Sequence, residues 1–98
     1  MHTVIRAYSG TGTKDLFALL EKRTADVESL MRSVDGFVSY TLARSEDGDF
    51  GFSVTVCNDK AGVEESSRKA KEWIMQNATG IVASAPTLSE GVVILHAK

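Results

Sequence analysis

The fold is decided by residues 37–57, FVSYTLARSEDGDFGFSVTVC. The segments 37–44 and 50–57 carry β-branched and aromatic residues, with apolar residues recurring at alternate positions, which is typical of β-strands. The polar run 45–49 between them contains Asp47-Gly48, a pair that favours tight turns. We therefore expect two antiparallel strands, 37–44 and 50–57, joined as a β-hairpin.

On the N-terminal side of this hairpin, the sequence predicts a strand followed by a helix. Residues 3–9 alternate, and the glycine and hydroxyl residues of 9–13 favour a loop. From Lys14 onward, apolar residues recur mostly at the three- and four-residue spacing of a helix with one buried side. We expect Thr13 to cap this helix and Gly36 to close it.

On the C-terminal side, the sequence predicts a second helix and a last strand. Asn58 or Asp59 is suited to cap a helix that continues to about Asn77, with apolar residues on one side and charged residues around the other. A less regular stretch containing the single proline follows, and residues 91–97 then read as a strand.

The order strand, helix, strand, strand, helix, strand predicts an α+β ferredoxin-like fold, in which two helices cover one face of a four-stranded antiparallel sheet. The other face requires a cover, because apolar residues occupy both alternating sets of positions in three of the strands, whereas a solvated face should be polar. The opposed residues are Val4 against Ile5, Val38, Tyr40 and Leu42 against Phe37, and Val92 and Ile94 against Val93 and Leu95. We therefore expect a homodimer in which the sheet faces of two copies meet.

Composition limits the class of protein. A length of 98 residues fits one domain spanning 1–98, and a net charge of -2 argues against a nucleic acid or an anionic membrane as partner. No apolar run approaches the roughly 20 residues of a membrane span, and no basic segment precedes an apolar one as in a signal peptide. Cys57 is the single cysteine, which excludes an internal disulfide. We expect a cytoplasmic protein.

Two local patterns invite a ligand interpretation. The run GTGTK at 10–14 lacks the spacing of a phosphate-binding loop, and Asp15 stands where a dinucleotide-binding loop has its third glycine. We therefore expect a plain strand-to-helix turn. His2 and His96 are expected near each other on neighbouring strands, but two imidazoles fall short of the three or four ligands that zinc requires. We expect no metal site.

Several stretches carry a resemblance to a known family: GFVSY at 36–40, FSVTV at 52–56, DKAGVEES at 59–66 and AKEWI at 70–74. Nearly the whole chain resembles the antibiotic-biosynthesis-monooxygenase-like proteins of the dimeric α/β-barrel superfamily, in particular an uncharacterised bacterial subgroup. The resemblance implies a ferredoxin-like protomer, a dimer whose two sheets form a barrel, and a small-molecule cavity between sheet and helices. The superfamily includes quinone-forming monooxygenases, haem-degrading enzymes and members with no known reaction, so the fold does not determine the activity.

The same resemblance bears on cofactors and site residues. Many relatives carry a tryptophan at the end of the third strand and a histidine about nine residues later, and here the corresponding residues are Cys57 and Ser66. No haem ligand is therefore carried over, and we expect no bound cofactor. The ligand-binding candidates are Trp73, Tyr40, Phe52 and Val54, and the weak catalytic candidates are His96 and Tyr40. Core packing explains Trp73 and Tyr40 equally well.

Two functional hypotheses follow. The first is a small-molecule-binding protein that takes an apolar or aromatic ligand, with activity as a cofactor-independent monooxygenase on an aromatic or polyketide-like compound. The second is a non-enzymatic dimeric binding or stress-linked module, which the scarcity of polar residues suited to catalysis favours. A water-free cavity with convergent hydrogen-bond donors near Tyr40 or His96 would support the enzyme, and helices packed flush on the sheet would oppose it.

Overall fold

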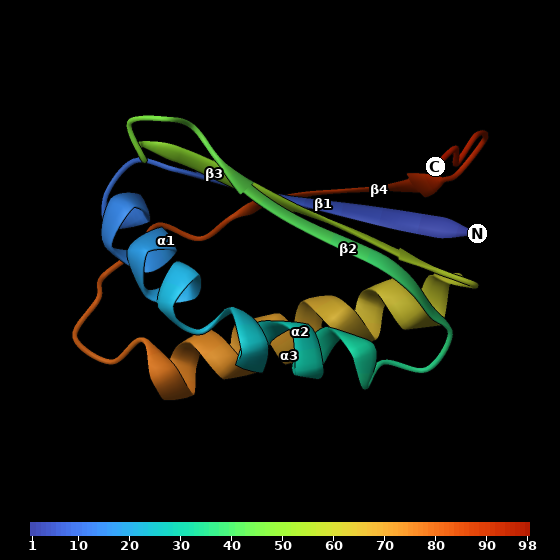
Figure 1. Cartoon of the computed structure of the whole chain (residues 1–98), viewed down its shortest axis with the longest axis horizontal. Coiled ribbons are helices and arrows are strands. Elements are labelled where there is room, and N and C mark those ends of the chain that lie inside the picture. The colour runs from blue at the N-terminus through green and yellow to red at the C-terminus, as the bar shows by residue number, and fades with distance from the viewer.

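The structure is a computed structural model that describes residues 1–98. The elements follow in the order β1 (His2–Ser9), α1 (Thr13–Lys22), α2 (Thr24–Arg32), β2 (Phe37–Arg44), β3 (Phe50–Cys57), α3 (Lys60–Asn77) and β4 (Thr87–Val92). The strands form one antiparallel sheet in the order β2-β3-β1-β4, and the helices lie together on one side of it (Figure 1). The predicted ferredoxin-like α+β fold is confirmed, as is the hairpin of β2 and β3.

The register of the strands assigns each strand residue to one face of the sheet, because directly paired residues point to the same side. Val4, Arg6 and Tyr8 of β1 are buried beneath the helices. Arg6 pairs with Ser53 of β3, and Tyr8 pairs with Gly51, so these β3 residues also face the helices. The intervening residues of β1 and β3 point to the opposite, open face.

The core beside α1 explains the glycine in β3. The rings of Tyr8 and Phe17 meet edge to face, with centroids 5.6 Å apart. A Cβ on Gly51 would lie 2.3 Å from the Phe17 ring, a distance at which atoms overlap. Leu16 and Leu20 of α1 complete this part of the core. Gly51 therefore gives Phe17 the space to reach the sheet.

The single helix expected from Lys14 to Gly36 is in fact two helices, α1 and α2, separated at Arg23. Arg23 leaves the helical conformation, and its side chain donates to Asn77 and lies 5.3 Å from the ring centroid of Trp73, both on α3. This contact accompanies a bend that lets α1 cross the end of the sheet while α2 runs beside α3 (Figure 1). Thr13 does not cap α1, because Gly12 occupies the N-cap position and no side chain bonds there.

The loop around Gly12 is a tight junction. Gly12 has a φ of 82°, which favours glycine, and a Cβ there would lie 2.1 Å from the carbonyl oxygen of Val82. The neighbouring Thr11 accepts a hydrogen bond from the amide of Ser84. The glycines of 10–14 thus serve a turn that packs against the segment leading to β4.

Of the two expected caps for the second helix, the structure selects Asp59. Its carboxylate accepts a hydrogen bond of 2.9 Å from the amide of Gly62. The helix, α3, ends at Asn77 as predicted. No helix of the chain has the length and apolar character needed to cross a membrane.

The prediction for the last strand was wrong in its bounds. β4 spans Thr87–Val92 instead of residues 91–97, and every residue in it is exposed. Ile94 and Leu95 lie beyond the strand with side chains 98% and 82% exposed. Hydrogen bonding to β1, rather than an apolar pattern, defines this edge strand.

The prediction for β2 also needs correction. An irregularity between Phe37 and Ser39 shifts the register, so that Tyr40 and Leu42 point to the same side of the sheet as Phe37, toward the helices. Val4 and Ile5 do oppose each other, since Val4 is fully buried and Ile5 is 40% exposed. The apolar residues of the open face therefore come mainly from β1 and β3.

The open face carries no charged side chain at any strand position. Its residues, by register, are Thr3, Ile5, Ala7, Ser9, Ser39, Thr41, Ala43, Phe50, Phe52, Val54, Val56, Thr87, Ser89 and Gly91. The rings of Phe50 and Phe52 lie side by side there, with centroids 5.9 Å apart. Six of these residues carry hydroxyl groups, and the large apolar ones lie on β1 and β3, so the face is uncharged and apolar at its centre.

Candidate functional site

The centre of the candidate site is Arg6, which is buried between the sheet and α3 with only 2% of its surface exposed. The alternation of β1 places it there, because Val4 and Tyr8 on either side point into the core. Arginine is almost never fully buried unless its charge is paired.

Neutral hydroxyl groups surround the Arg6 guanidinium. From β3, Ser53 accepts from Nε at 3.1 Å and Thr55 accepts from one terminal nitrogen at 2.7 Å. From α3, Ser66 and Ser67 accept from the other terminal nitrogen at 3.2 and 3.0 Å. Ser66 also donates to the carbonyl of Val63, which fixes its orientation. These bonds account for four of the five N–H groups that a guanidinium carries.

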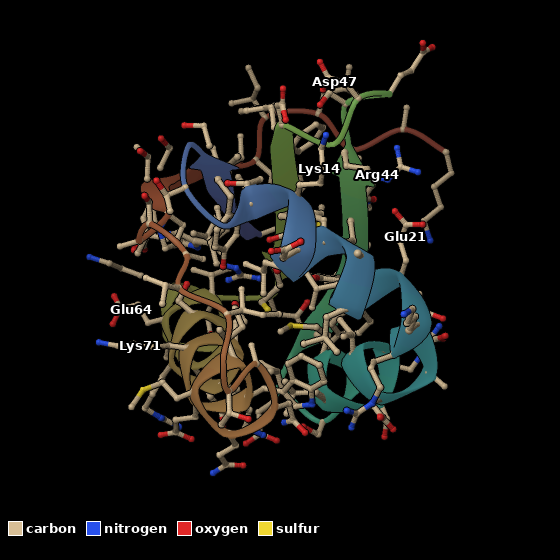
Figure 2. All side chains as sticks on the ribbon, turned by 90° about the vertical axis from the view of Figure 1, so that its left-hand side faces the viewer. Lys14, Glu21, Arg44, Asp47, Glu64 and Lys71 are labelled. Atoms are coloured by element: carbon tan, nitrogen blue, oxygen red, sulfur yellow. The ribbon has the colours of Figure 1, made fainter.

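No carboxylate balances the charge of Arg6, which belongs to none of the ion pairs within 4.0 Å. The other four arginines, Arg23, Arg32, Arg44 and Arg68, all pair with a carboxylate at the exposed surface. In Figure 2 the side chains of Arg44 and Glu21 turn toward each other outside the core. The only buried arginine is thus the only one without a negative partner.

Two tyrosines lie next to this charge, Tyr8 and Tyr40. Burial raises the pKa of both phenols, and the positive charge of Arg6 acts in the opposite direction. Burial likewise lowers the pKa of Arg6, while Tyr40 and Tyr8 oppose that shift. At neutral pH the group therefore consists of one guanidinium and two neutral phenols, all able to donate hydrogen bonds.

Two cavities meet at Arg6 and Tyr8. The outer cavity has a volume of about 370 Å³ and lies between β1, α3 and the segment 83–86. It is lined by Arg6, Tyr8, Leu16, Ser67, Ala70, Lys71, Ile74, Met75, Ala83, Ser84, Ala85, Pro86 and Leu88. The inner cavity, of about 30 Å³, shares Arg6 and Tyr8 and extends toward Tyr40 and Trp73. Neither lining contains histidine, aspartate or glutamate.

A separate groove of about 370 Å³ lies between α2 and β2 and includes Tyr40 but not Arg6 in its lining. Its lining includes Glu28 and Arg32, which pair with each other at 2.8 Å. The charges of this groove are therefore already balanced, in contrast to those of the outer cavity.

The structure divides the predicted ligand-binding residues between two faces. Trp73 and Tyr40 both line the inner cavity. Phe52 and Val54 point to the open face instead, because Ser53 between them faces Arg6. His96 lies after β4, outside the two cavities that contain Arg6.

The sequence does not assemble a metal site. No group of three or more His, Cys, Asp and Glu side chains is placed to hold a metal ion. The Nδ1 atom of His2 is buried without a hydrogen-bond partner. Cys57 is a buried free thiol whose pKa is raised by burial, which favours the unreactive protonated form.

The residues that sequence reasoning missed are Arg6 and its hydroxyl partners. A signal was present, because Arg6 holds the same alternation phase as Val4 and Tyr8, and this phase places its side chain on the core side of the strand. The seryl residues on α3 had no such signal, since serine is common on exposed helix surfaces. Only the packing of α3 on the sheet brings them to the guanidinium.

The fold of the whole chain was compared with those of known proteins. No family model matches the chain, and no curated protein matches it. Among solved structures, a putative antibiotic biosynthesis monooxygenase from Chloroflexus aurantiacus is similar with a TM-score of 0.66 and 19% identity, over 99% of this chain and 96% of its own. The chain has the antibiotic-biosynthesis-monooxygenase-like fold.

Two further structures with this fold belong to oxygenases. A monooxygenase from Streptomyces coelicolor, ActVA-Orf6, was solved with the ligand nanaomycin D and has a TM-score of 0.65 and 17% identity, over 97% of this chain and 92% of its own. SnoaB from Streptomyces nogalater, a cofactor-independent oxygenase, has a TM-score of 0.64 and 18% identity, over 97% and 94%. Likeness at these identities establishes the fold of this chain and leaves its substrate open.

Proposed function

We propose that this chain is a homodimeric, cytoplasmic small-molecule-binding protein. Its cavity between sheet and helices takes an aromatic or polyketide-like compound, which the protein oxygenates with dioxygen and no bound cofactor. The observation that carries the proposal is the outer cavity of about 370 Å³, which has an apolar lining and the donors of Arg6 and Tyr8 at one end. A mostly apolar pocket with a few convergent polar groups is typical of small-molecule sites.

The chemistry of the site suits a substrate that reacts as an anion. An electron-rich ring methylene becomes an enolate when its proton passes to solvent water, since neither cavity lining holds a general base, and the enolate is then oxidised by dioxygen. The methylene becomes a carbonyl, one oxygen atom enters the product and the other leaves as water, with the substrate supplying the electrons. Arg6 would stabilise the enolate oxygen electrostatically in a site where water does not screen the charge. The low identity of the oxygenases with this fold makes them support for this proposal only.

The test uses an anthrone as probe, because its oxidation to the anthraquinone is this reaction. Dioxygen uptake and quinone absorbance are measured with and without protein. We expect the protein to accelerate both, with one dioxygen consumed per quinone formed. Binding of the anthraquinone, seen as a rise in melting temperature without any acceleration, would reject the oxygenase and leave a binding protein.

The homodimer rests on the open face of the sheet. That face carries Ile5, Phe52 and Val54 and no charge. A second copy of the same sheet is the simplest apolar cover, and it gives a closed, two-fold symmetric assembly. The exposed residues Ile94 and Leu95 add apolar surface at the end of the chain.

Light scattering tests the assembly. We expect a dimer that the substitution Val54→Asp separates, because a carboxylate would be buried without a partner. The control is Val82→Asp, which places the same charge on a loop side chain that is 81% exposed. A wild-type monomer would reject the dimer, as would a Val54→Asp variant that remains dimeric.

A non-enzymatic binding module is the second candidate function, and one observation favours it. Neither cavity at Arg6 contains a histidine or a carboxylate, and burial raises the pKa of both tyrosines. The site thus holds hydrogen-bond donors without a general base near neutral pH. Ligand binding without turnover of any oxidisable probe would support this candidate.

A further inference from the structure

We propose that the ligand of the outer cavity carries an acidic oxygen, either a carboxylate or the anion of an acidic enol or phenol, and that this oxygen binds the guanidinium of Arg6. The inference deepens the proposed function and depends on it, because it names the substrate class of the same cavity.

The positive charge of Arg6 has no negative partner in the chain. Removing a guanidinium from water is costly unless a negative group and hydrogen bonds compensate, and Arg6 has only the hydrogen bonds. The chain does not lack acids, since it has 13 aspartate and glutamate residues. None of them forms an ion pair with Arg6, so an anionic ligand would supply the missing charge.

The guanidinium of Arg6 is accessible from the outer cavity only on the side of Ser67. Ser53 and Thr55 hold it from the sheet, and Ser66 holds it from the buried side of α3. The terminal nitrogen that donates to Ser67 lies on the cavity side, because both Arg6 and Ser67 line the outer cavity. An anionic oxygen on the cavity side would therefore replace the Ser67 hydroxyl as the acceptor of an N–H group that is already fixed in place.

The charged residues that line the outer cavity are both positive. Arg6 at its inner end and Lys71 at its rim are its only charged residues, although the chain has a net charge of -2. Figure 2 shows the Lys71 side chain directed outward from α3. Lys71 therefore favours the approach of an anion, whereas Arg6 makes the contact.

Most of the remaining surface of the outer cavity is apolar. Leu16, Ile74, Pro86 and Leu88 line the same cavity. A carboxylate or enolate attached to a flat apolar body would place its charge on Arg6 and its rings on these side chains. A small inorganic anion would leave this surface in contact with water.

The test compares acidic probes with neutral ones of the same shape by isothermal titration calorimetry. One pair is 2-naphthoate and 2-naphthamide, and the other is 2-hydroxy-1,4-naphthoquinone, which is an enolate at neutral pH, and its 2-methoxy ether. We expect wild type to bind at least one acidic probe at least about tenfold more tightly than its neutral partner. The pair that shows the preference distinguishes a carboxylate from an enolate.

Three variants assign the preference to Arg6. Arg6→Met should abolish the acidic preference while retaining the affinity for the neutral probe, and Arg6→Lys should retain part of the preference. Arg68→Met is the matched control, because Arg68 lies exposed on α3 outside the cavity, and it should bind as wild type does. Retained binding of the neutral probe shows that a variant is folded.

The outcomes separate the two proposals. Equal affinity for acidic and neutral probes, or a preference that survives in Arg6→Met, would overturn the acidic-oxygen inference while the binding function stands. Failure of all four probes to bind, together with failure of the anthrone and its quinone, would overturn the proposed function and the inference with it.

Discussion

Arg6 is expected to tolerate an uncharged replacement better than a charged one. In wild type, four hydrogen bonds from a charged group, each contributing about 1.5–3 kcal/mol, offset a desolvation cost of several kcal/mol. Arg6→Met removes both, so we expect the free energy of unfolding to change by no more than about 1.5 kcal/mol. Arg6→Lys keeps a buried charge with at most three donors on one atom, and should lose about 2–4 kcal/mol.

Urea denaturation at several pH values measures this difference. A buried lysine has a folded-state pKa below its unfolded value of about 10.4, so the folded protein binds fewer protons than the unfolded chain between these two values. The stability of Arg6→Lys should therefore rise with pH between 7 and 9, by up to about 1.4 kcal/mol per pH unit. Wild type and Arg6→Met should show no such rise.

The opposite order would refute this reasoning. If Arg6→Lys is as stable as wild type while Arg6→Met loses more than about 3 kcal/mol, the guanidinium serves as a structural link between β1, β3 and α3. The midpoint and the slope of the urea transition must both be compared, because a changed slope indicates a different unfolded or native state.

Three other predictions concern the surroundings of the site. Because the pKa values of Tyr8 and Tyr40 are raised in the folded protein, the stability that the two neutral phenols contribute is fully present below pH 10 and is lost as the pH rises through their folded-state pKa values. Phenolate absorbance should therefore appear together with unfolding. Ionisation of either tyrosine at pH 10 in the folded protein would contradict this. Gly51→Ala should destabilise the fold by about 1–3 kcal/mol in thermal melts, and adding Phe17→Leu should recover part of the loss, whereas no recovery would reject the steric cause. Asp59→Ala should cost about 1 kcal/mol in urea denaturation, and no loss would mean that its cap bond contributes nothing.

The hairpin and α3 were predictable because their signals are local. Alternation and Asp47-Gly48 define the hairpin, and Asp59 with an amphipathic run defines α3. The division at Arg23 had no local signal, since the seven-residue spacing from Leu20 to Val27 is what one continuous helix would also show. The break is visible only in the contacts that Arg23 makes with α3.

The last strand and part of the site were missed for different physical reasons. β4 is an exposed edge strand, so its residues show no alternation of buried and exposed positions. The strand was predicted at residues 91–97 instead because that segment contains an apolar run. Phe52 and Val54 alternate with Ser53, and the sequence of β3 alone does not show which of the two sets faces the helices, because only the pairing with β1 determines it. Arg6 was overlooked because a charged residue is normally assigned to the surface.

A buried sheet face is normally apolar and an exposed one polar, and the two faces of this sheet depart from that rule in opposite ways. The face under the helices buries a positive charge without a negative partner, and the open face exposes apolar residues without a charge. The proposed anionic ligand and the proposed second copy of the chain would cover different faces, because the first offers a negative charge and the second an apolar surface. The same strands serve both, since Ile5 and Ala7 flank Arg6 while Phe52 and Val54 flank Ser53. We expect the proposed dimer to restrain the backbone of β1 and β3 that positions Arg6 and Ser53, and ligand binding at Arg6 to depend on that restraint.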